Sequence, residues 1–171
     1  DRFHGVWPHW LHGPTGKVKP FGTKDDGGDL VESSFLMQSL LCVRQYVKDG
    51  NEKEKALAAK IDELWHGMEF DWYRNGDQNV LYWHWSPEYA WKKNFAIRGY
   101  NECLITYILA ACSPTHGVPT DVYTQGWGES GAIVEPHEVE GYQLNMRYQG
   151  TQAGPLFWAH YSFLGLDPNG L

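Results

Sequence analysis

The sequence is short of several features that would narrow its class at once. Its 171 residues contain only three cysteines, Cys42, Cys103 and Cys112, which excludes a disulfide framework and leaves one bridge or three thiols. No apolar run approaches the roughly 20 residues that cross a bilayer, so membrane insertion is not expected. The 14 basic residues are outnumbered by 21 acidic ones. That balance argues against a nucleic-acid partner, which needs a basic stripe.

Motifs for several kinds of chemistry are missing as well. The chain has no glycine-rich phosphate loop, and its eight histidines include no His-x-x-x-His pair. Ser113 and His116 lie close in sequence, but they lack a nucleophile elbow and an evident acid partner. We therefore expect no metal site, no cofactor and no serine nucleophile.

Aromatic side chains are what the sequence has in excess. It carries 9 Trp, 10 Tyr and 7 Phe, which together make 15% of the chain. Trp and Tyr combine a flat apolar ring with a polar edge, and such rings suit ligands with apolar faces, sugars among them. For any single ring, burial in the core is the alternative interpretation.

Hydrophobic periodicity predicts two antiparallel helices. Apolar residues recur at helical spacing over residues 30–47, and Asp29 before them is a preferred N-cap. Glu32 follows Asp29 by three residues, so we expect the two to form a capping box. Asn51 can cap a second helix whose apolar positions reach residue 68. The short connection predicts an αα-hairpin.

Further helices are expected later in the chain. Residues 101–112 are strongly apolar and predict an inner helix with Glu102 in its first turn. Residues 156–163 predict another apolar helix. Residues 80–85 are extended in pattern, and residues 139–148 suggest a short strand pair. The expected fold class is mainly α.

Four carboxylates fall within eight residues around Gly27 and Gly28: Asp25, Asp26, Asp29 and Glu32. Carboxyls this close raise one another's pKa, which is how an acid–base site keeps one of them protonated. Helix capping is an equally good explanation of the same cluster. Calcium binding is a weaker third, because the EF-hand pattern is missing.

Three further stretches could carry chemistry. Glu102 begins an apolar segment, where desolvation would raise its pKa, although a first-turn glutamate is also common for structural reasons. Residues 81–87 place His84 between two indoles, as a sugar platform or as a packed loop. Residues 154–163 carry Trp158, His160 and Tyr161, which could face a cavity or simply pack against neighbouring helices.

Five blocks of the sequence carry a family resemblance. They are residues 26–32, 81–87, 99–102, 113–116 and 154–168, in that order. The chain resembles the glucoamylase-like hydrolases of glycoside hydrolase family 144, of endo-β-1,2-glucanase type. The resemblance implies an (α/α)6 toroid of the six-hairpin glycosidase kind, a β-1,2-glucan substrate and inverting hydrolysis without metal. A toroid needs well over twice this length, so residues 1–171 are expected to be one incomplete central segment of the catalytic domain, with the remaining helices as its partners.

The resemblance also implies site residues. Glu102 is the expected general acid, and Asp25, Asp29 and Glu32 are expected acidic residues of the cleft, with Asp25 or Asp29 as the base. Inversion would place the two reacting carboxyls roughly 6.5–9.5 Å apart. The residues expected near sugar subsites are Trp83, His84, Trp85, Tyr100, Asn101, Trp127, His160 and Tyr161.

Two other functions stay open from the sequence. The chain could belong to a β-glucan-binding protein without activity, or to a transglycosylating domain like those of cyclic β-1,2-glucan synthases. Because a β-glucan polymer is met outside the cytoplasm, the resemblance favours a periplasmic or secreted bacterial protein.

Overall fold

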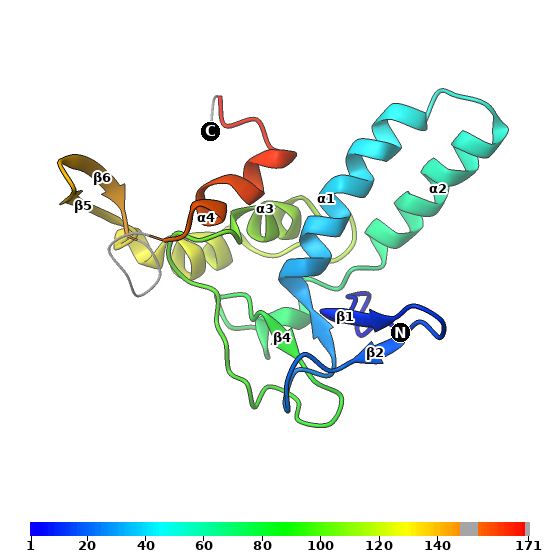
Figure 1. Cartoon of the computed structure of the whole chain (residues 1–171), viewed down its shortest axis with the longest axis horizontal. Coiled ribbons are helices and arrows are strands. Elements are labelled where there is room, and N and C mark those ends of the chain that lie inside the picture. Colours follow the sequence, from blue (N-terminus) through cyan, green and yellow to red (C-terminus); the bar gives the residue numbers. More distant parts are fainter. Residues whose placement is uncertain (148–153, 170–171) are drawn as a thin grey trace.

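Two long antiparallel helices, α1 (Leu30–Val47) and α2 (Glu52–His66), form the predicted αα-hairpin (Figure 1). They are seen in a computed structural model that describes residues 1–147 and 154–169. Asn51 caps α2, and Glu54 completes a capping box with it. The inner helix α3 (Leu104–Cys112) packs against α1, so three helices form the centre of the fold.

Shorter elements surround these helices, and the loops between them are long. The short strands form three antiparallel pairs, β1 with β2, β3 with β4, and β5 with β6. The described ranges contain no helix that is both long and apolar enough to cross a membrane. The remaining elements are β1 (Trp10–His12), β2 (Lys17–Lys19), β3 (Gly28–Asp29), η1 (Trp72–Arg74), β4 (His84–Trp85), η2 (Val122–Trp127), η3 (Glu129–Gly131), β5 (Val134–Val139), β6 (Tyr142–Met146), α4 (Leu156–His160) and η4 (Tyr161–Leu164).

The N-terminus of α1 differs from the prediction in one respect. Asp29 caps the helix, because its Oδ1 accepts from the backbone N–H groups of Val31 and Glu32 at 3.1 and 3.0 Å. The expected capping box with Glu32 is wrong, since the N–H of Asp29 donates to the carbonyl of Trp7 at 2.8 Å. Because the carbonyl of Trp7 accepts the bond that Glu32 was expected to accept, the Glu32 carboxyl stays at the surface.

The start of α3 also differs from the prediction. Residues 101–103 form a turn, in which Oδ1 of Asn101 accepts from the backbone N–H of Cys103 at 2.9 Å. Such side-chain bonds compete with helix formation, so the helix begins only at Leu104. Glu102 therefore lies in the turn before the helix and not in its first turn. The predicted burial of this helix is confirmed for most of its length.

The strands β3 and β4 hold two distant stretches together just before α1. Gly28 pairs with Trp85 and Asp29 with His84, so the extended pattern of residues 80–85 is a paired strand only at its end. A Cβ at Gly27 would lie 2.1 Å from the carbonyl oxygen of Trp85. A Cβ at Gly28 would lie 2.0 Å from Oη of Tyr73. Both positions therefore exclude every side chain.

The C-terminal part agrees with the expected elements and adjusts their bounds. The predicted strand pair is the β5–β6 hairpin, which begins before residue 139, while residue 148 lies outside the described residues. The predicted last helix is α4 followed directly by the 3-10 turn η4. Tyr161 brings this segment to α1, with its ring 5.4 Å from that of Phe35.

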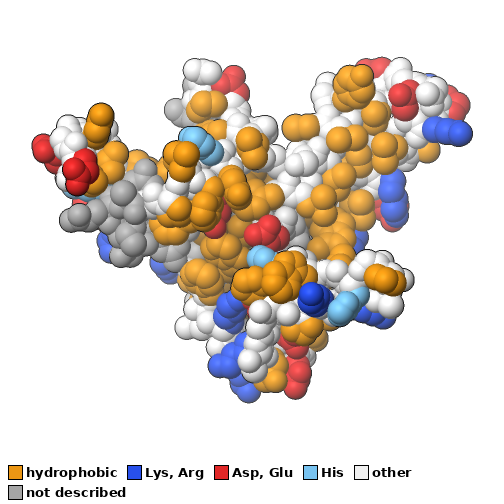
Figure 2. Space-filling view, viewed as in Figure 1, with side chains coloured by type: hydrophobic (Ala, Val, Ile, Leu, Met, Phe, Trp, Pro, Cys, Tyr) orange, Lys and Arg blue, Asp and Glu red, His pale blue; other side chains and the backbone are white. Residues whose placement is uncertain are grey.

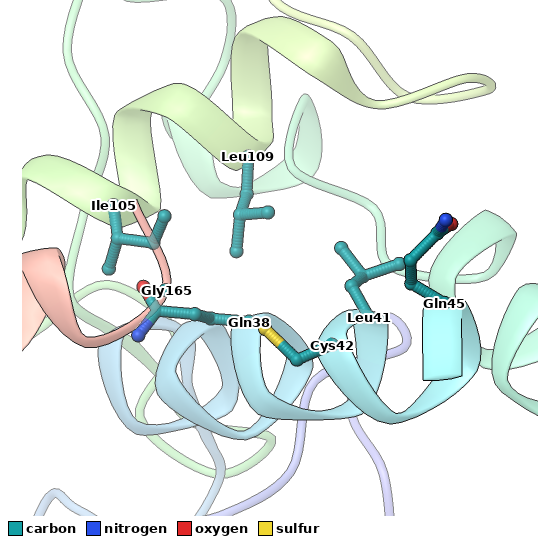
Figure 3. A pocket seen from close by; sticks show the side chains of 7 residues that line it. All are labelled: Gln38, Leu41, Cys42, Gln45, Ile105, Leu109 and Gly165. Atoms are coloured by element: carbon teal, nitrogen blue, oxygen red, sulfur yellow. The ribbon is translucent and has the colours of Figure 1, made fainter. Parts of the chain in front are cut away.

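A groove of about 430 Å³ lies between α1 and α3 (Figure 3). Leu41 and Cys42 of α1 face Ile105 and Leu109 of α3 across it, and Gln38, Gln45 and Gly165 complete its lining. Elsewhere on α1, apolar side chains are exposed, and Tyr46 is 89% accessible. Helix α1 thus carries apolar residues on more faces than this chain covers.

Tyr107 should stabilise the centre of the fold through its hydroxyl. Its Oη donates to the carbonyl of Ile97 at 2.7 Å and accepts from the N–H of Leu81 at 3.0 Å, all within the core. Tyr107→Phe leaves both backbone groups buried without a partner, so we expect a loss of about 1–3 kcal/mol in the free energy of unfolding. Urea unfolding measures this loss. Tyr46→Phe, at an exposed tyrosine, is the matched control, and equal stability of the two variants would contradict the assignment.

Candidate active site

Asp29 and His9 form a tight pair at the start of α1. Nδ1 of His9 lies 2.8 Å from Oδ2 of Asp29, whose other oxygen caps the helix. The pKa of His9 is raised, chiefly by this hydrogen bond, while partial burial opposes the rise. The charges of Glu32 and Asp25 raise it further, so a positive imidazolium is favoured beside these carboxylates.

Glu32 lies in the first turn of α1 and lines an open pocket of about 260 Å³ with His9. Trp7, Pro8 and Leu11 form the facing wall. Its surroundings raise the pKa of Glu32, first through desolvation and then through the charge of Asp29, whereas His9 lowers it. The carboxyl is exposed and, unlike that of Asp29, it is not occupied by capping.

Glu102 reaches the same region from the turn before α3. Its side chain is buried, and Oε2 has no hydrogen-bond partner within residues 1–147 and 154–169. Burial raises the pKa of Glu102, a backbone hydrogen bond opposes this, and the charges of Glu32 and Asp29 add to the rise. Ser162 fixes the turn, because its Oγ donates to the carbonyl of Glu102 at 2.6 Å and accepts from Ile105 N–H at 3.1 Å.

Asp25 belongs to a second, more buried group behind the first. Its Oδ2 pairs with Nζ of Lys93, and its Oδ1 lies 3.2 Å from Nε2 of His84. That nitrogen accepts from the N–H of Gly27 at 3.3 Å, which requires a lone pair on it. Desolvation lowers the pKa of His84, against the charge of Asp25, so a neutral imidazole is favoured.

The arrangement therefore contains carboxyls in two different environments. Figure 2 shows acidic side chains among hydrophobic ones near the middle of one face, where the helices meet the N-terminal loops. Desolvation is the first cause of the raised pKa at both Glu102 and Glu32, but Glu32 is the more exposed of the two and His9 opposes the rise there. Two carboxyls separated in this way can serve as acid and base. No group of three or more His, Cys, Asp or Glu side chains in the described part of the chain could hold a metal ion.

The indoles beside His84 do not form one flat platform. Trp83 stacks on Phe95, with ring centroids 5.0 Å apart, whereas Trp85 meets Trp72 edge-on at 5.9 Å. Both are partly buried, and His84 between them is fully buried. In this chain the stretch packs as part of the fold beneath the acidic residues.

The other predicted sugar-binding residues divide by exposure. Trp127 and Asn101 are buried, and Trp127 packs on Tyr107 with centroids 5.8 Å apart. Tyr100 is half-buried and contacts Trp127 at 6.2 Å. His160 and Tyr161 are exposed on the segment that Ser162 fastens beside Glu102.

Three residues at the site were missed by the sequence analysis: His9, Lys93 and Ser162. Each contacts a residue far away in the sequence, and such contacts leave no periodic signal. The aromatic setting of His9, in Trp7-Pro8-His9-Trp10, was the one available hint.

A family model and a curated protein both match this chain. The Glycoamylase family model matches residues 94–171. A curated protein of Parabacteroides distasonis, an exo-β-1,2-glucooligosaccharide sophorohydrolase acting at the non-reducing end, is 42% identical over 99% of this chain and 26% of its own length.

Solved structures of relatives match this chain over almost its whole length. An endo-β-1,2-glucanase from Chitinophaga pinensis, in complex with sophorotriose and glucose, is 65% identical with a TM-score of 0.95 over 99% of this chain and 41% of that one. A protein from Bacteroides caccae is 69% identical with a TM-score of 0.97, over 98% of this chain and 41% of that one. The chain thus spans about two fifths of these solved relatives. It belongs to the glucoamylase-like family that includes the β-1,2-glucan-degrading enzymes.

Proposed function

We propose that the full-length protein hydrolyses β-1,2-glucan by acid–base catalysis. The observation that carries this is the difference between two carboxyls whose pKa is raised: Glu102 is buried, whereas Glu32 is exposed and has His9 to oppose the rise. Similarity supports the substrate, since relatives over almost the whole of this chain are an endo-β-1,2-glucanase and a β-1,2-glucooligosaccharide sophorohydrolase.

In the proposed reaction Glu102 is the general acid. It gives its proton to the glucosidic oxygen as the bond to the anomeric carbon breaks. Water adds to that carbon from the opposite face, with inversion, and loses a proton to a carboxylate, directly or through a substrate hydroxyl. Burial raises the pKa of Glu102, and this favours the protonated form that a general acid needs.

Glu32 is a better second carboxylate than the expected Asp25 or Asp29. Both oxygens of Asp29 are engaged, one in capping α1 and one with His9. Asp25 is buried against Lys93 and His84. A group that activates water needs a lone pair open to it, which Glu32 has. In this proposal Asp25 and Asp29 position the site.

The sugar-binding residues follow the same division. Tyr161, His160 and Tyr100 have accessible polar edges, so we assign them to substrate contact. Trp127, Asn101 and His84 are buried and are assigned to support of the site from behind. Trp83 and Trp85 pack beneath the acidic residues and contact substrate only at their exposed edges.

The chain is proposed as one segment of an (α/α)6 toroid in a periplasmic or secreted enzyme. Helix α1 is apolar on faces that this chain leaves open, which is typical of a helix buried within a larger assembly. The groove between α1 and α3 has room for side chains of a further helix packed against it. Its lining residues are labelled in Figure 3. The occupant is a helix of the full-length protein from outside these residues.

Glu102→Gln tests the general acid in the full-length protein. The amide keeps the shape of the carboxyl but has no proton to give, so we expect hydrolysis of β-1,2-glucan to fall about 10²–10⁴-fold. Release of reducing ends measures the rate, and the anomer formed first reports inversion. Glu138→Gln, at an exposed glutamate, is the control and should keep full activity.

The products also separate the competing functions. Affinity for the polymer without any product from the wild type would indicate a binding protein. Longer or cyclic chains would indicate transglycosylation. Full hydrolysis by Glu102→Gln would remove Glu102 from the mechanism.

Cys42 tests the proposed packing of the toroid. In this chain Cys42 lines the open groove, and its thiol is accessible. If a further helix fills the groove, the thiol is covered in the full-length protein. We expect alkylation of Cys42 to be slow in the native full-length protein and fast after denaturation. Rapid native labelling, located by peptide mass, would contradict the packing.

A further inference from the structure

His9 occupies a position that the proposed mechanism leaves unused. It lies just before β1, and its Nδ1 is 2.8 Å from Oδ2 of the buried Asp29. The same ring lines the pocket of about 260 Å³ that Glu32 also lines. One imidazole thus contacts the cap of α1 and lies in the same pocket as the exposed carboxyl of Glu32.

Among the described residues that line this pocket, His9 alone can carry a positive charge. Asp29 and Glu32 face it from α1 and its cap, and Asp25 adds its charge from the preceding loop. The remaining neighbours are rings, with Phe21 at 4.2 Å and Trp10 at 5.5 Å. Lys93 is tied to Asp25, and Lys19 lies over the ring of Trp10. Arg2 lies over Trp7, on the wall of the same pocket.

We propose that His9 is a positioning residue of the acid–base pair, whose imidazolium keeps Glu32 ionised while Glu102 holds its proton. The proposal rests on the hydrolytic function above. It deepens that function by naming the group that gives Glu32 and Glu102 different protonation states.

The physical need for such a group follows from the carboxyls themselves. The charge of Asp29 raises the pKa of Glu32, and the charges of Glu32 and Asp29 raise the pKa of Glu102. A cation near one of them favours its charged form selectively. His9 lines the same pocket as Glu32 and lowers the pKa of that carboxyl. Glu102 is buried, comes from a different segment and does not line this pocket. The two carboxyls can then titrate in separate pH ranges.

His9→Asn in the full-length enzyme separates charge from shape. The Asn amide can still donate to Asp29, as Nδ1 does, but it carries no charge. Without the cation the pKa of Glu32 rises, so the acid limb of kcat/KM against pH should move up by about one unit. The alkaline limb, set by Glu102, should stay in place. His9→Lys restores a positive charge, so its acid limb should stay near the wild-type position.

Several outcomes would overturn the proposal. A purely structural His9 predicts that both variants lose activity equally at every pH, with both limbs unmoved. An unchanged profile in His9→Asn would also reject it. His116→Asn is the matched control, because it removes another histidine paired with an aspartate, Asp71, at 3.1 Å. Its profile should equal that of the wild type.

A second measurement does not depend on turnover. Carbon NMR of full-length protein labelled at the glutamate carboxyls follows the titration of Glu32. The signal of Glu32 is the one that is missing in the Glu32→Gln variant. A rise in the pKa of Glu32 in His9→Asn supports the proposal even if the wild type releases no sugar. An unchanged Glu32 titration rejects it. Failure of the proposed hydrolysis would appear separately, as a wild type without products.

Discussion

The site depends on the hydrogen bonds made by one buried residue, Asp29. Its backbone N–H holds the carbonyl of Trp7, one carboxyl oxygen caps α1, and the other meets His9. Through β3 it also pairs with His84. Three separate stretches of chain, around residues 7–9, 29–32 and 84, therefore meet at a single side chain and its backbone. The positions of the acidic residues relative to one another follow from that convergence.

Negative charge in this region is compensated by individual contacts. Asp25 has Lys93 and Asp29 has His9, each within ion-pair distance. Glu32 is left to solvent, and Glu102 avoids the cost of a buried charge by favouring its protonated form. The fold thus tolerates four carboxyls in one region because each meets a different environment. The same differences suit the carboxyls to different steps of a hydrolysis.

The features that were predicted correctly from the sequence depend on interactions between residues close together in the chain. The period of α1 and α2, the cap at Asp29 and the capping box at Asn51 involve residues within one turn of each other. The family resemblance located the acidic residues without their geometry. The errors came from competition by distant or rival partners. The carbonyl of Trp7 took the bond expected of Glu32, and the side chain of Asn101 delayed the start of α3. His9, Lys93 and Ser162 join the site only through tertiary contacts, which no spacing rule anticipates.

The two glycines before Asp29 limit how such a protein can change. Any side chain at Gly27 or Gly28 would overlap the backbone of Trp85 or the hydroxyl of Tyr73. Laboratory evolution of substrate preference should therefore leave residues 27–29 unvaried, because most library members changed there would be lost before selection. The β1–β2 hairpin has open space around Gly13 and borders the pocket of Glu32 through Leu11. Substitutions in that hairpin can change the lining of the pocket without altering residues 27–29, which hold the acidic residues in place.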